Sequence, residues 1–305
     1  MSSSLSLCRE VELKSLCRRL GACAVGIARA DAVDDDVARS FRGWLSAGRH
    51  GSMAYMARNV ELRLDPRKLF PGAMSIISMA FPYRPAGGYH HPLIADYALG
   101  EDYHRVLPRR LAPVVAWLAD QCGATSRVTV DSAPMLERYW AAKSGVGFIG
   151  SNHMLIVPGV GSGVFLVEII TSAVLRPDAP LSIGCGQCGR CLSACPGGAL
   201  RPDGSFDARR CYSYLTIEHR GEPVFVPDAS RQVYGCDVCA RVCPHNSVEP
   251  PEPLEEFRPD PRLLSLDRLA LSKISSGDYR RLFKMSAILR QSVTKLRQIA
   301  KFNKL

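Results

Sequence analysis

Residues 185–196 read CGQCGRCLSACP and space four cysteines as Cys185-x2-Cys188-x2-Cys191-x3-Cys195, with Pro196 directly after the last one. This is the spacing of bacterial ferredoxins, in which three close thiolates bind one 4Fe-4S cluster and the fourth reaches a second cluster. A pair of structural zinc sites also uses C-x2-C pairs, but zinc requires neither the x3-Cys-Pro ending nor an exchange of ligands between groups. The stretch therefore predicts a ferredoxin-like module with two 4Fe-4S clusters.

A second cysteine group follows later in the chain and is one ligand short. Cys236-x2-Cys239-x3-Cys243-Pro244 has only three cysteines, and Cys211, between the two groups, is the available eighth ligand. The crossover rule of two-cluster ferredoxins then divides the thiolates four and four. One cluster would be held by Cys185, Cys188, Cys191 and Cys243, and the other by Cys195, Cys211, Cys236 and Cys239.

Composition indicates a soluble protein with a large core. The chain has 305 residues, of which 47% are hydrophobic. It contains no run of eighteen apolar residues, and its first residues lack the segments of a signal peptide. We therefore expect a cytoplasmic protein without a membrane segment, and we assign no role to the scattered Cys8, Cys17, Cys23 and Cys122. The net charge of +10 favours a polyanionic partner, although a merely basic enzyme is the alternative.

Apolar patterns before the cysteines alternate between helices and strands, which predicts a sheet covered by helices. A first helix ends at Gly21, and further helical patterns cover 106–122 and 135–143. The strand candidates are 22–28, 75–81, 127–130, 154–157 and 164–170.

Breaks in these patterns divide the chain into three parts. Pro, Asp and Gly gather at 177–184, and a Pro- and Glu-rich connector covers 247–261. We therefore expect an α/β domain at 1–178, a ferredoxin-like α+β module at 179–250, and a connector with a short, basic, helical C-terminal tail at 251–305.

Several sequence blocks resemble the epoxyqueuosine reductase family, which comprises cobalamin-dependent iron-sulfur enzymes of tRNA queuosine synthesis. Besides the eight cysteines, they are HGSMAYM (50–56), RLDPR (63–67), PGA (71–73), YALGEDYH (97–104), VDSAPMLER (130–138), GVGFIG (145–150), DARRCYSYLTIE (207–218) and YGCD (234–237). The blocks are spread over most of the chain and are too long and unusual to arise by chance.

The resemblance implies that the enzyme removes the epoxide oxygen from a modified base at the tRNA wobble position, giving an alkene and water. Cobalamin would lie between a cobalamin-binding α/β domain and the cluster module, and the clusters would reduce it stepwise to cob(I)alamin, which engages the epoxide carbon. Asp131 would deliver a proton to the departing oxygen. By family position, the cofactor contacts would be Arg63, Asp131, Asn152, Leu155, Ser162, Leu166, Ser213 and Tyr214.

The same resemblance implies the partners. They would be a tRNA with a queuosine-type anticodon and an electron donor such as flavodoxin or ferredoxin, and we expect a monomer. Asp102-Tyr103-His104 matches only half of the D-x-H-x-x-G signature for a lower cobalamin ligand, because Leu107 occupies the glycine position. As in the family, we expect no histidine ligand from the protein.

Asp131 can donate a proton only if it is protonated. Its apolar neighbours Val130, Ala133 and Pro134 predict a pKa raised by burial. The alternative is a helix N-cap, because Asp-Ser-Ala-Pro precedes a helical pattern that has Glu137 in its first turns.

The chain also departs from the family pattern. Ser151, Val167 and His245 stand where other residues are usual, which leaves open a paralogue with another substrate. The tail from Lys273 to Lys304 predicts a phosphate-facing helix pair, with a solvated helix as the alternative. Its cations are Arg280, Arg281, Lys284, Arg290, Lys295, Arg297 and Lys301, opposed by Asp278.

Two other functions compete with tRNA reduction. A related cobalamin reductase of a small molecule could retain Asp131, and its basic tail would then be incidental. An electron carrier without catalysis would need only the ferredoxin module. Bound cobalamin would exclude the carrier, and salt-sensitive tRNA binding would argue against the small-molecule enzyme.

Overall fold

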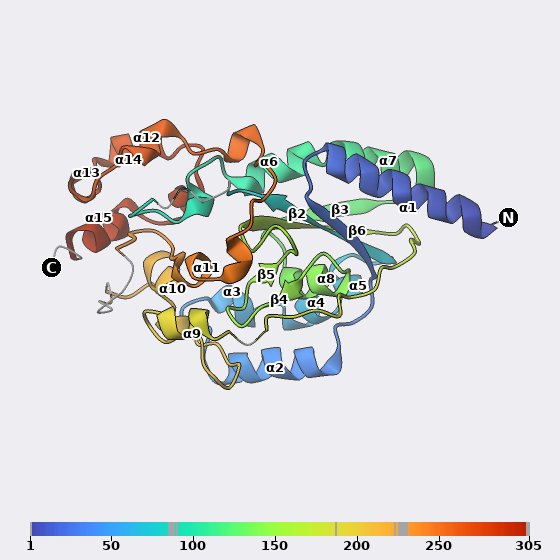
Figure 1. The fold of residues 1–305 in the computed structure, drawn as a ribbon, viewed down its shortest axis with the longest axis horizontal. Helices are drawn as coiled ribbons and strands as arrows, with labels where there is room; N and C mark the ends of the chain where they lie inside the picture. The colour runs from blue at the N-terminus through green and yellow to red at the C-terminus, as the bar shows by residue number, and fades with distance from the viewer. Residues whose placement is uncertain are drawn as a thin grey trace.

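The computed structural model describes residues 2–84, 89, 91–186, 188–222, 224 and 231–302. Its centre is a four-stranded sheet of order β1-β2-β6-β3, in which all neighbouring strands are antiparallel (Figure 1). The strands are β1 (Ala24–Arg29), β2 (Ser75–Pro82), β3 (Ser126–Thr129) and β6 (Val164–Thr171). Four of the predicted strands are therefore confirmed as members of one sheet.

Two of the predicted elements are wrong in part. Residues 154–157 do not join the sheet, because β5 (Leu155–Ile156) pairs with β4 (Phe148–Ile149) in a separate ribbon. The predicted helix 106–122 is two helices, α6 (Tyr103–Arg110) and α7 (Ala112–Cys122). Pro113 lies in the first turn of α7, where the N–H that it lacks is not needed.

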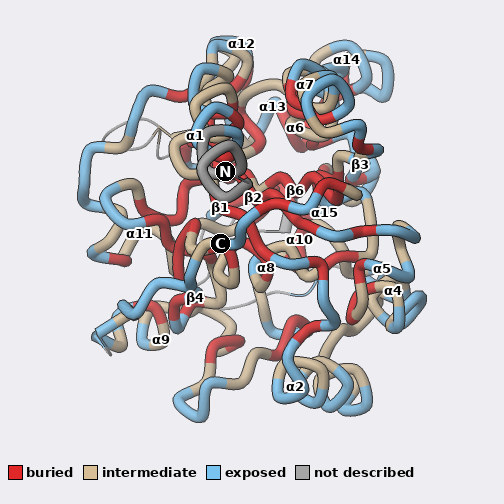
Figure 2. Tube along the Cα trace, turned by 90° about the vertical axis from the view of Figure 1, so that its right-hand side faces the viewer, coloured by how far each residue is buried: buried red, intermediate tan, exposed pale blue. Residues whose placement is uncertain are grey.

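Helices cover both faces of the sheet (Figures 1 and 2), and all eight residues of β2 are buried. Burial on both faces explains why the strands read as continuous apolar runs. Helix α7 packs with α1 (Ser2–Arg19) on one side, and the other side carries α2 (Asp35–Ser46), α3 (Ala54–Ala57), α4 (Val60–Leu64), α5 (Pro66–Leu69) and α8 (Glu137–Lys143). Among the described residues, no helix combines the length and the apolar character that crossing a membrane requires.

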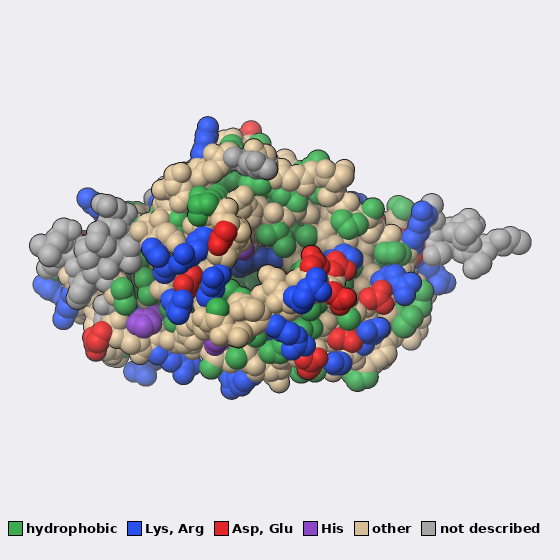
Figure 3. Space-filling model, turned by 90° about the horizontal axis from the view of Figure 1, so that it is seen from below, with side chains coloured by type: hydrophobic (Ala, Val, Ile, Leu, Met, Phe, Trp, Pro, Cys, Tyr) green, Lys and Arg blue, Asp and Glu red, His purple; other side chains and the backbone are tan. Residues whose placement is uncertain are grey.

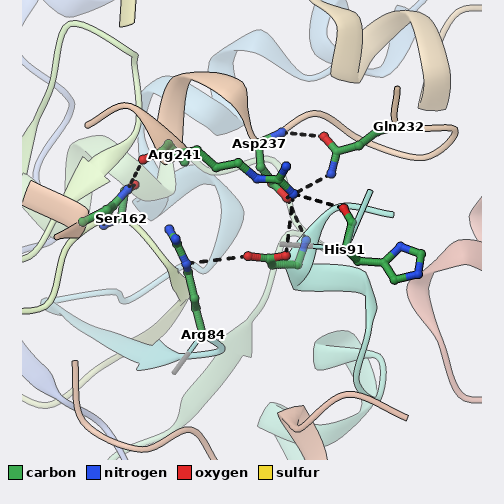
Figure 4. Close-up of polar contacts among 9 residues, drawn as sticks. Arg84, His91, Ser162, Gln232, Asp237 and Arg241 are labelled. Atoms are coloured by element: carbon green, nitrogen blue, oxygen red, sulfur yellow. Dashed lines mark hydrogen bonds and ion pairs between the residues drawn. The ribbon is translucent and has the colours of Figure 1, made fainter. Parts of the chain in front are cut away.

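The cysteine module consists of short helices beside the sheet: α9 (Arg190–Ala194), η2 (Ala208–Arg210), α10 (Tyr212–Ile217), α11 (Val238–Arg241) and η3 (Pro244–Asn246). A buried group of charges joins it to the segment that follows β2 (Figure 4). Asp96, at the start of η1 (Asp96–Ala98), donates its N–H to Asp237 Oδ2 at 2.9 Å. Its carboxylate lies 3.6 Å from Arg84 and 4.0 Å from Arg241. The two carboxylates are offset by the two guanidinium groups, so that removing either partner would leave a buried charge uncompensated.

The tail folds back onto the rest of the molecule. It consists of η4 (Glu255–Phe257), α12 (Pro261–Leu264), α13 (Arg268–Lys273), α14 (Ser276–Leu282), η5 (Ala287–Arg290) and α15 (Val293–Phe302). The predicted short helices are therefore confirmed. Phe283, Ile288 and Leu296 are buried with Ile94 and Tyr234 in one apolar cluster. The tail is thus part of the core rather than an appended helix pair.

Gly26 in β1 tests how closely α8 and its C-terminal turn pack on the sheet. A Cβ at this position would lie 2.0 Å from the carbonyl oxygen of Ser144, so Gly26→Ala should lower the free energy of unfolding by about 1–3 kcal/mol. Gly43 in α2 is the matched control, because a Cβ there meets nothing within 4 Å. Gly43→Ala should instead raise stability by roughly 0.5–1 kcal/mol. Urea denaturation measures both, and equal stabilities for the two variants would contradict the packing described.

Candidate active site

Asp131 lies in the loop between β3 and α8, with its side chain 53% exposed. The Tyr103 hydroxyl donates to Asp131 Oδ2 at 3.2 Å. The same oxygen lies 3.8 Å from His104 Nε2 and 3.7 Å from Arg290 Nη1. A carboxylate that solvent can reach therefore meets a phenol, an imidazole and a guanidinium from α6 and the tail.

Asp102, the N-cap residue of α6, holds His104 in place. Asp102 caps α6 by accepting the His104 N–H at 3.0 Å, and its Oδ1 also lies 2.7 Å from His104 Nδ1. Burial lowers the pKa of His104, but the carboxylates of Asp102 and Asp131 outweigh that effect and raise it to about 9. The imidazole is therefore protonated at neutral pH.

The prediction that burial raises the pKa of Asp131 is wrong. Burial does act in that direction, but the positive charges of His104 and Arg290 outweigh it, so the pKa of Asp131 is lowered. The apolar neighbours in sequence do not decide the matter, because these cations come from distant segments.

The N-cap alternative for Asp131 is also wrong. Helix α8 begins at Glu137, and its N-cap residue is Leu136, without a side-chain cap. Asp131 instead has a φ of 47°, the left-handed region that non-glycine residues rarely adopt. Its side chain is therefore free of a capping role.

Two further carboxyl groups lie behind Asp131. Glu137 Oε1 accepts the Asp131 N–H at 2.5 Å, and burial together with the charge of Asp131 raises the pKa of Glu137 to about 8. Glu168 on β6 is fully buried, opposite Ser78 in the sheet register. Burial, together with the charges of Glu137 and Asp131, raises the pKa of Glu168 well above its usual value. Both Glu137 and Glu168 therefore favour their protonated forms, whereas Asp131 is ionised.

Arg290 connects this group to the cysteine module. Its Nη2 lies 2.7 Å from Glu218 Oε1, directly after α10, while its Nη1 faces Asp131. Its guanidinium also lies 5.9 Å from the centre of the Tyr55 ring. Three parts of the chain therefore meet at one cation.

Two of the residues expected to bind cobalamin have buried polar atoms without a partner among the described residues. Arg63 donates to the carbonyl oxygens of Tyr55 and Met135, at 3.2 and 3.5 Å, and its Nε has no partner. Asn152 Oδ1 accepts the Met154 N–H at 3.1 Å, and its Nδ2 has no partner. Buried donors of this kind require an acceptor, which fits the polar side groups of a bound cofactor.

The other expected contacts lie in different surroundings. Tyr214 accepts the Ser52 N–H at 2.6 Å and donates to its hydroxyl at 2.9 Å, and Ser213 precedes it in α10. Ser162 is fixed to Asn246 of the module by its N–H at 2.6 Å. Leu155 and Leu166 belong to one apolar cluster beside the β4-β5 ribbon.

The cysteines fall into two neighbourhoods, of which the first contains Cys185, Cys188, Cys191 and Cys243. Burial, followed by the charges of Cys185 and Cys188, raises the pKa of both Cys191 and Cys243. These thiols are therefore close enough to repel one another when ionised.

The second neighbourhood contains Cys195, Cys211, Cys236 and Cys239. Burial and then the charges of the other three raise the pKa of Cys239. Cys211 stands outside both dense groups in sequence, yet the charge of Cys195 acts on it as well. Thiolates crowded in this way are the donor set that an iron-sulfur cluster uses.

Gly197 brings the segments of Cys195 and Cys211 together. A Cβ at Gly197 would lie 1.8 Å from the carbonyl oxygen of Arg210, and Arg210 Nε donates to the Gly197 carbonyl at 2.8 Å. Only glycine permits this approach, which sets one cysteine beside the other.

Sequence reasoning missed Glu168, Glu218 and Arg290 as neighbours of Asp131. A lone acid in the apolar strand VFLVEIIT was a usable signal for Glu168, because an unpaired buried carboxyl is costly. Nothing distinguished Arg290 from the other tail cations, and only folding reveals its position.

Family models match two parts of this chain. One described as epoxyqueuosine reductase QueG, DUF1730, matches residues 63–132, and a 4Fe-4S double cluster binding domain matches residues 184–246. The second match confirms the prediction of two 4Fe-4S clusters.

Whole proteins and solved structures are also similar. The epoxyqueuosine reductase of Leadbetterella byssophila is 37% identical over 302 residues, which are 96% of this chain and 97% of that protein. A crystal structure of epoxyqueuosine reductase with an epoxyqueuosine-modified tRNA-Tyr stem loop has a TM-score of 0.84 and 29% identity, covering 97% of this chain and 80% of that one. A Bacillus subtilis epoxyqueuosine reductase, whose catalytic aspartate loop is swung out of the active site, has a TM-score of 0.83 and 27% identity, with the same coverage.

Cys211→Ala tests the ligand that stands alone in sequence. The variant should lose one cluster and retain the other, so iron and sulfide should fall from about eight of each per chain to roughly half. Metal and sulfide analysis of anaerobically reconstituted protein measures this. Cys122→Ala, at the end of α7, is the control and should keep both clusters. Unchanged iron in Cys211→Ala would show that the second ligand set is wrong.

Proposed function

Because this chain belongs to the epoxyqueuosine reductase family, we propose that it reduces the epoxide of epoxyqueuosine at the tRNA wobble position to give queuosine. The reaction consumes two electrons and two protons, breaks both C–O bonds of the epoxide, and yields an alkene and water. The site must therefore combine a source of electrons with side chains that donate protons.

The contact between Asp131, Arg290 and Glu218 is the observation that carries this proposal. It places a carboxylate of the sheet domain, which solvent can reach, beside the segment that directly follows Cys211. A proton-handling group and an electron-carrying module thus face one site, as a reductive deoxygenation requires.

Two 4Fe-4S clusters supply the electrons, and we propose their ligands from the two thiol neighbourhoods. Cys185, Cys188, Cys191 and Cys243 would hold one cluster. Cys195, Cys211, Cys236 and Cys239 would hold the other, next to Tyr214 and the site. Each set of four closes a cluster without a vacant position.

We propose that cobalamin, the second cofactor, binds between the sheet domain and the module. Its reduced cobalt would supply the nucleophilic chemistry that opens the epoxide. We propose that the unpartnered donors of Arg63 and Asn152 bind its polar side groups. Leu155, Ser162, Leu166, Ser213 and Tyr214 would complete the pocket.

We assign proton transfer to Asp131 together with His104. Asp131 is the carboxyl that faces the open site, but in the resting protein His104 holds the proton. Proton transfer from His104 through Asp131 would deliver it to the departing oxygen. This order keeps Asp131 as the group at the reacting atom while explaining its lowered pKa.

The charge of the molecule fits a tRNA partner. Lys and Arg side chains gather beside a hollow on the face that Figure 3 shows. We propose that the protein acts in the cytoplasm as a monomer and accepts electrons from a flavodoxin or ferredoxin. The decisive experiment is an assay of the cluster- and cobalamin-loaded protein on epoxyqueuosine-containing tRNA under reducing conditions. Release of queuosine supports the proposal, and an inert tRNA with intact cofactors would overturn it.

Asp131→Asn isolates the proton-transfer role. Asn tolerates a positive φ and has a similar volume, but it cannot pass on a carboxyl proton. Turnover on the tRNA substrate should fall by about a hundredfold or more, with iron content and cobalamin binding unchanged. Asp34→Asn, at an exposed pair with Lys143, is the control and should keep full turnover. Near-normal turnover by Asp131→Asn would leave this carboxyl without a catalytic role.

The tail offers a test of phosphate contacts that preserves the fold. Arg290, Lys295 and Arg297 contact Glu218, His219 and Ile274, whereas Arg280 and Lys284 are exposed, with no ion pair to a described residue.

Arg280→Glu with Lys284→Glu should therefore weaken tRNA binding and reduce the slope of log affinity against log salt by about two. The control Arg9→Glu with Arg18→Glu changes the net charge equally on α1, and it should leave binding nearly unchanged. Filter binding at several salt concentrations measures both slopes. Equal slopes in the two double variants would place the phosphate contacts outside α14.

A further inference from the structure

The loop that carries Asp131 has a backbone conformation that is uncommon for a residue with a Cβ. Asp131 has a φ of 47°, which aspartate adopts more readily than most such residues but still only as an isolated position. Such a conformation persists only where surrounding contacts determine it. Among the residues that the structure describes, its backbone N–H donates to the Glu137 carboxyl at 2.5 Å.

Glu137 is well placed to act as a fixed point. It is the first residue of α8, and this helix packs against β1, β2 and β6 through the buried Trp140 and Ala141. The contact closes a ring of seven residues, 131–137, between the loop and the helix. The position of Asp131 is therefore tied to the sheet through the Glu137 side chain.

We propose that Glu137 is a positioning residue, whose carboxyl group holds the backbone amide of Asp131 and so keeps the Asp131 side chain turned toward Tyr103 and His104. This inference rests on the function proposed above, in which Asp131 passes on the proton. It assigns Glu137 no contact with substrate or cofactor. The contact is geometric: an oxygen at the right reach is required, and a negative charge is not.

Substitutions at Glu137 distinguish two properties of its side chain, the distance that its oxygen can span to the Asp131 amide and its negative charge when ionised. Glu137→Gln keeps an oxygen at the same reach and is neutral, as Glu137 itself is when its raised pKa leaves it protonated. Glu137→Asp keeps a carboxyl group but shortens the side chain, so that its oxygen no longer reaches the Asp131 amide. Glu137→Leu removes the acceptor and leaves the amide unsatisfied. Ser132→Ala is the control, because Ser132 accepts the N–H of Val130 in the same loop, at 3.3 Å.

The first readout is hydrogen exchange of the loop amides, measured by mass spectrometry on the cluster-loaded protein without substrate. Exchange at Asp131 should be about tenfold faster in Glu137→Leu and Glu137→Asp, and within about threefold of wild type in Glu137→Gln and Ser132→Ala. Equal exchange in all variants would overturn the proposal. So would fast exchange in Glu137→Gln, because charge rather than reach would then decide. If Glu137→Leu folds poorly, Glu137→Asp supports the same ranking.

The second readout is steady-state turnover on the tRNA substrate. In Glu137→Asp, kcat should fall about tenfold or more with KM nearly unchanged, and Glu137→Gln should restore kcat to within about threefold of wild type. Loss of kcat in Glu137→Gln equal to that in Glu137→Asp would contradict a positioning role. Failure of the proposed function is distinguishable, because a wild-type protein inactive on tRNA would still show the exchange pattern.

Discussion

The guanidinium of Arg290 lies between Asp131 and Glu218, and the site depends on this one cation. Without it, the carboxylates of Asp131 in the sheet domain and Glu218 beside the cysteine module would lose the cation that they share. Two neighbouring carboxylates repel each other, and the repulsion is stronger where protein excludes water. The tail is therefore an electrostatic component of the site as well as a part of its core.

The three carboxyl groups at this site differ in pKa because their surroundings differ. Asp131 meets cations and is ionised, Glu137 meets the charge of Asp131 and favours a proton, and Glu168 lies beneath both in the sheet without solvent. Neighbouring acids with pKa values pushed apart can divide the roles of acid and base. Here the arrangement keeps one carboxyl charged at the opening and two neutral behind it.

The cysteine module was predictable because seven of its eight cysteines stand in short spacings that do not depend on the rest of the fold. The sheet strands were predictable for a similar reason, since a strand buried on both faces leaves a continuous apolar run. The electrostatics of Asp131 were not, because its pKa depends on His104 and on Arg290, which is far away in sequence. The helix break at Leu111 and the β4-β5 ribbon also depend on tertiary packing rather than on local pattern.

Arg290 follows Asp131, Glu218 and the cysteine module in the sequence, and this order has a consequence for biogenesis. Chains are made from the N-terminus, and domains generally fold as units in that order. Asp131, Glu218 and all eight cysteines between Cys185 and Cys243 are therefore synthesised before the cation that lies between the two carboxylates. The cysteines of a nascent chain can therefore begin to bind iron and sulfide before the positive charge of Arg290 is present at the site. The cation takes its place between the two carboxylates once the tail has been made and has packed against Ile94 and Tyr234.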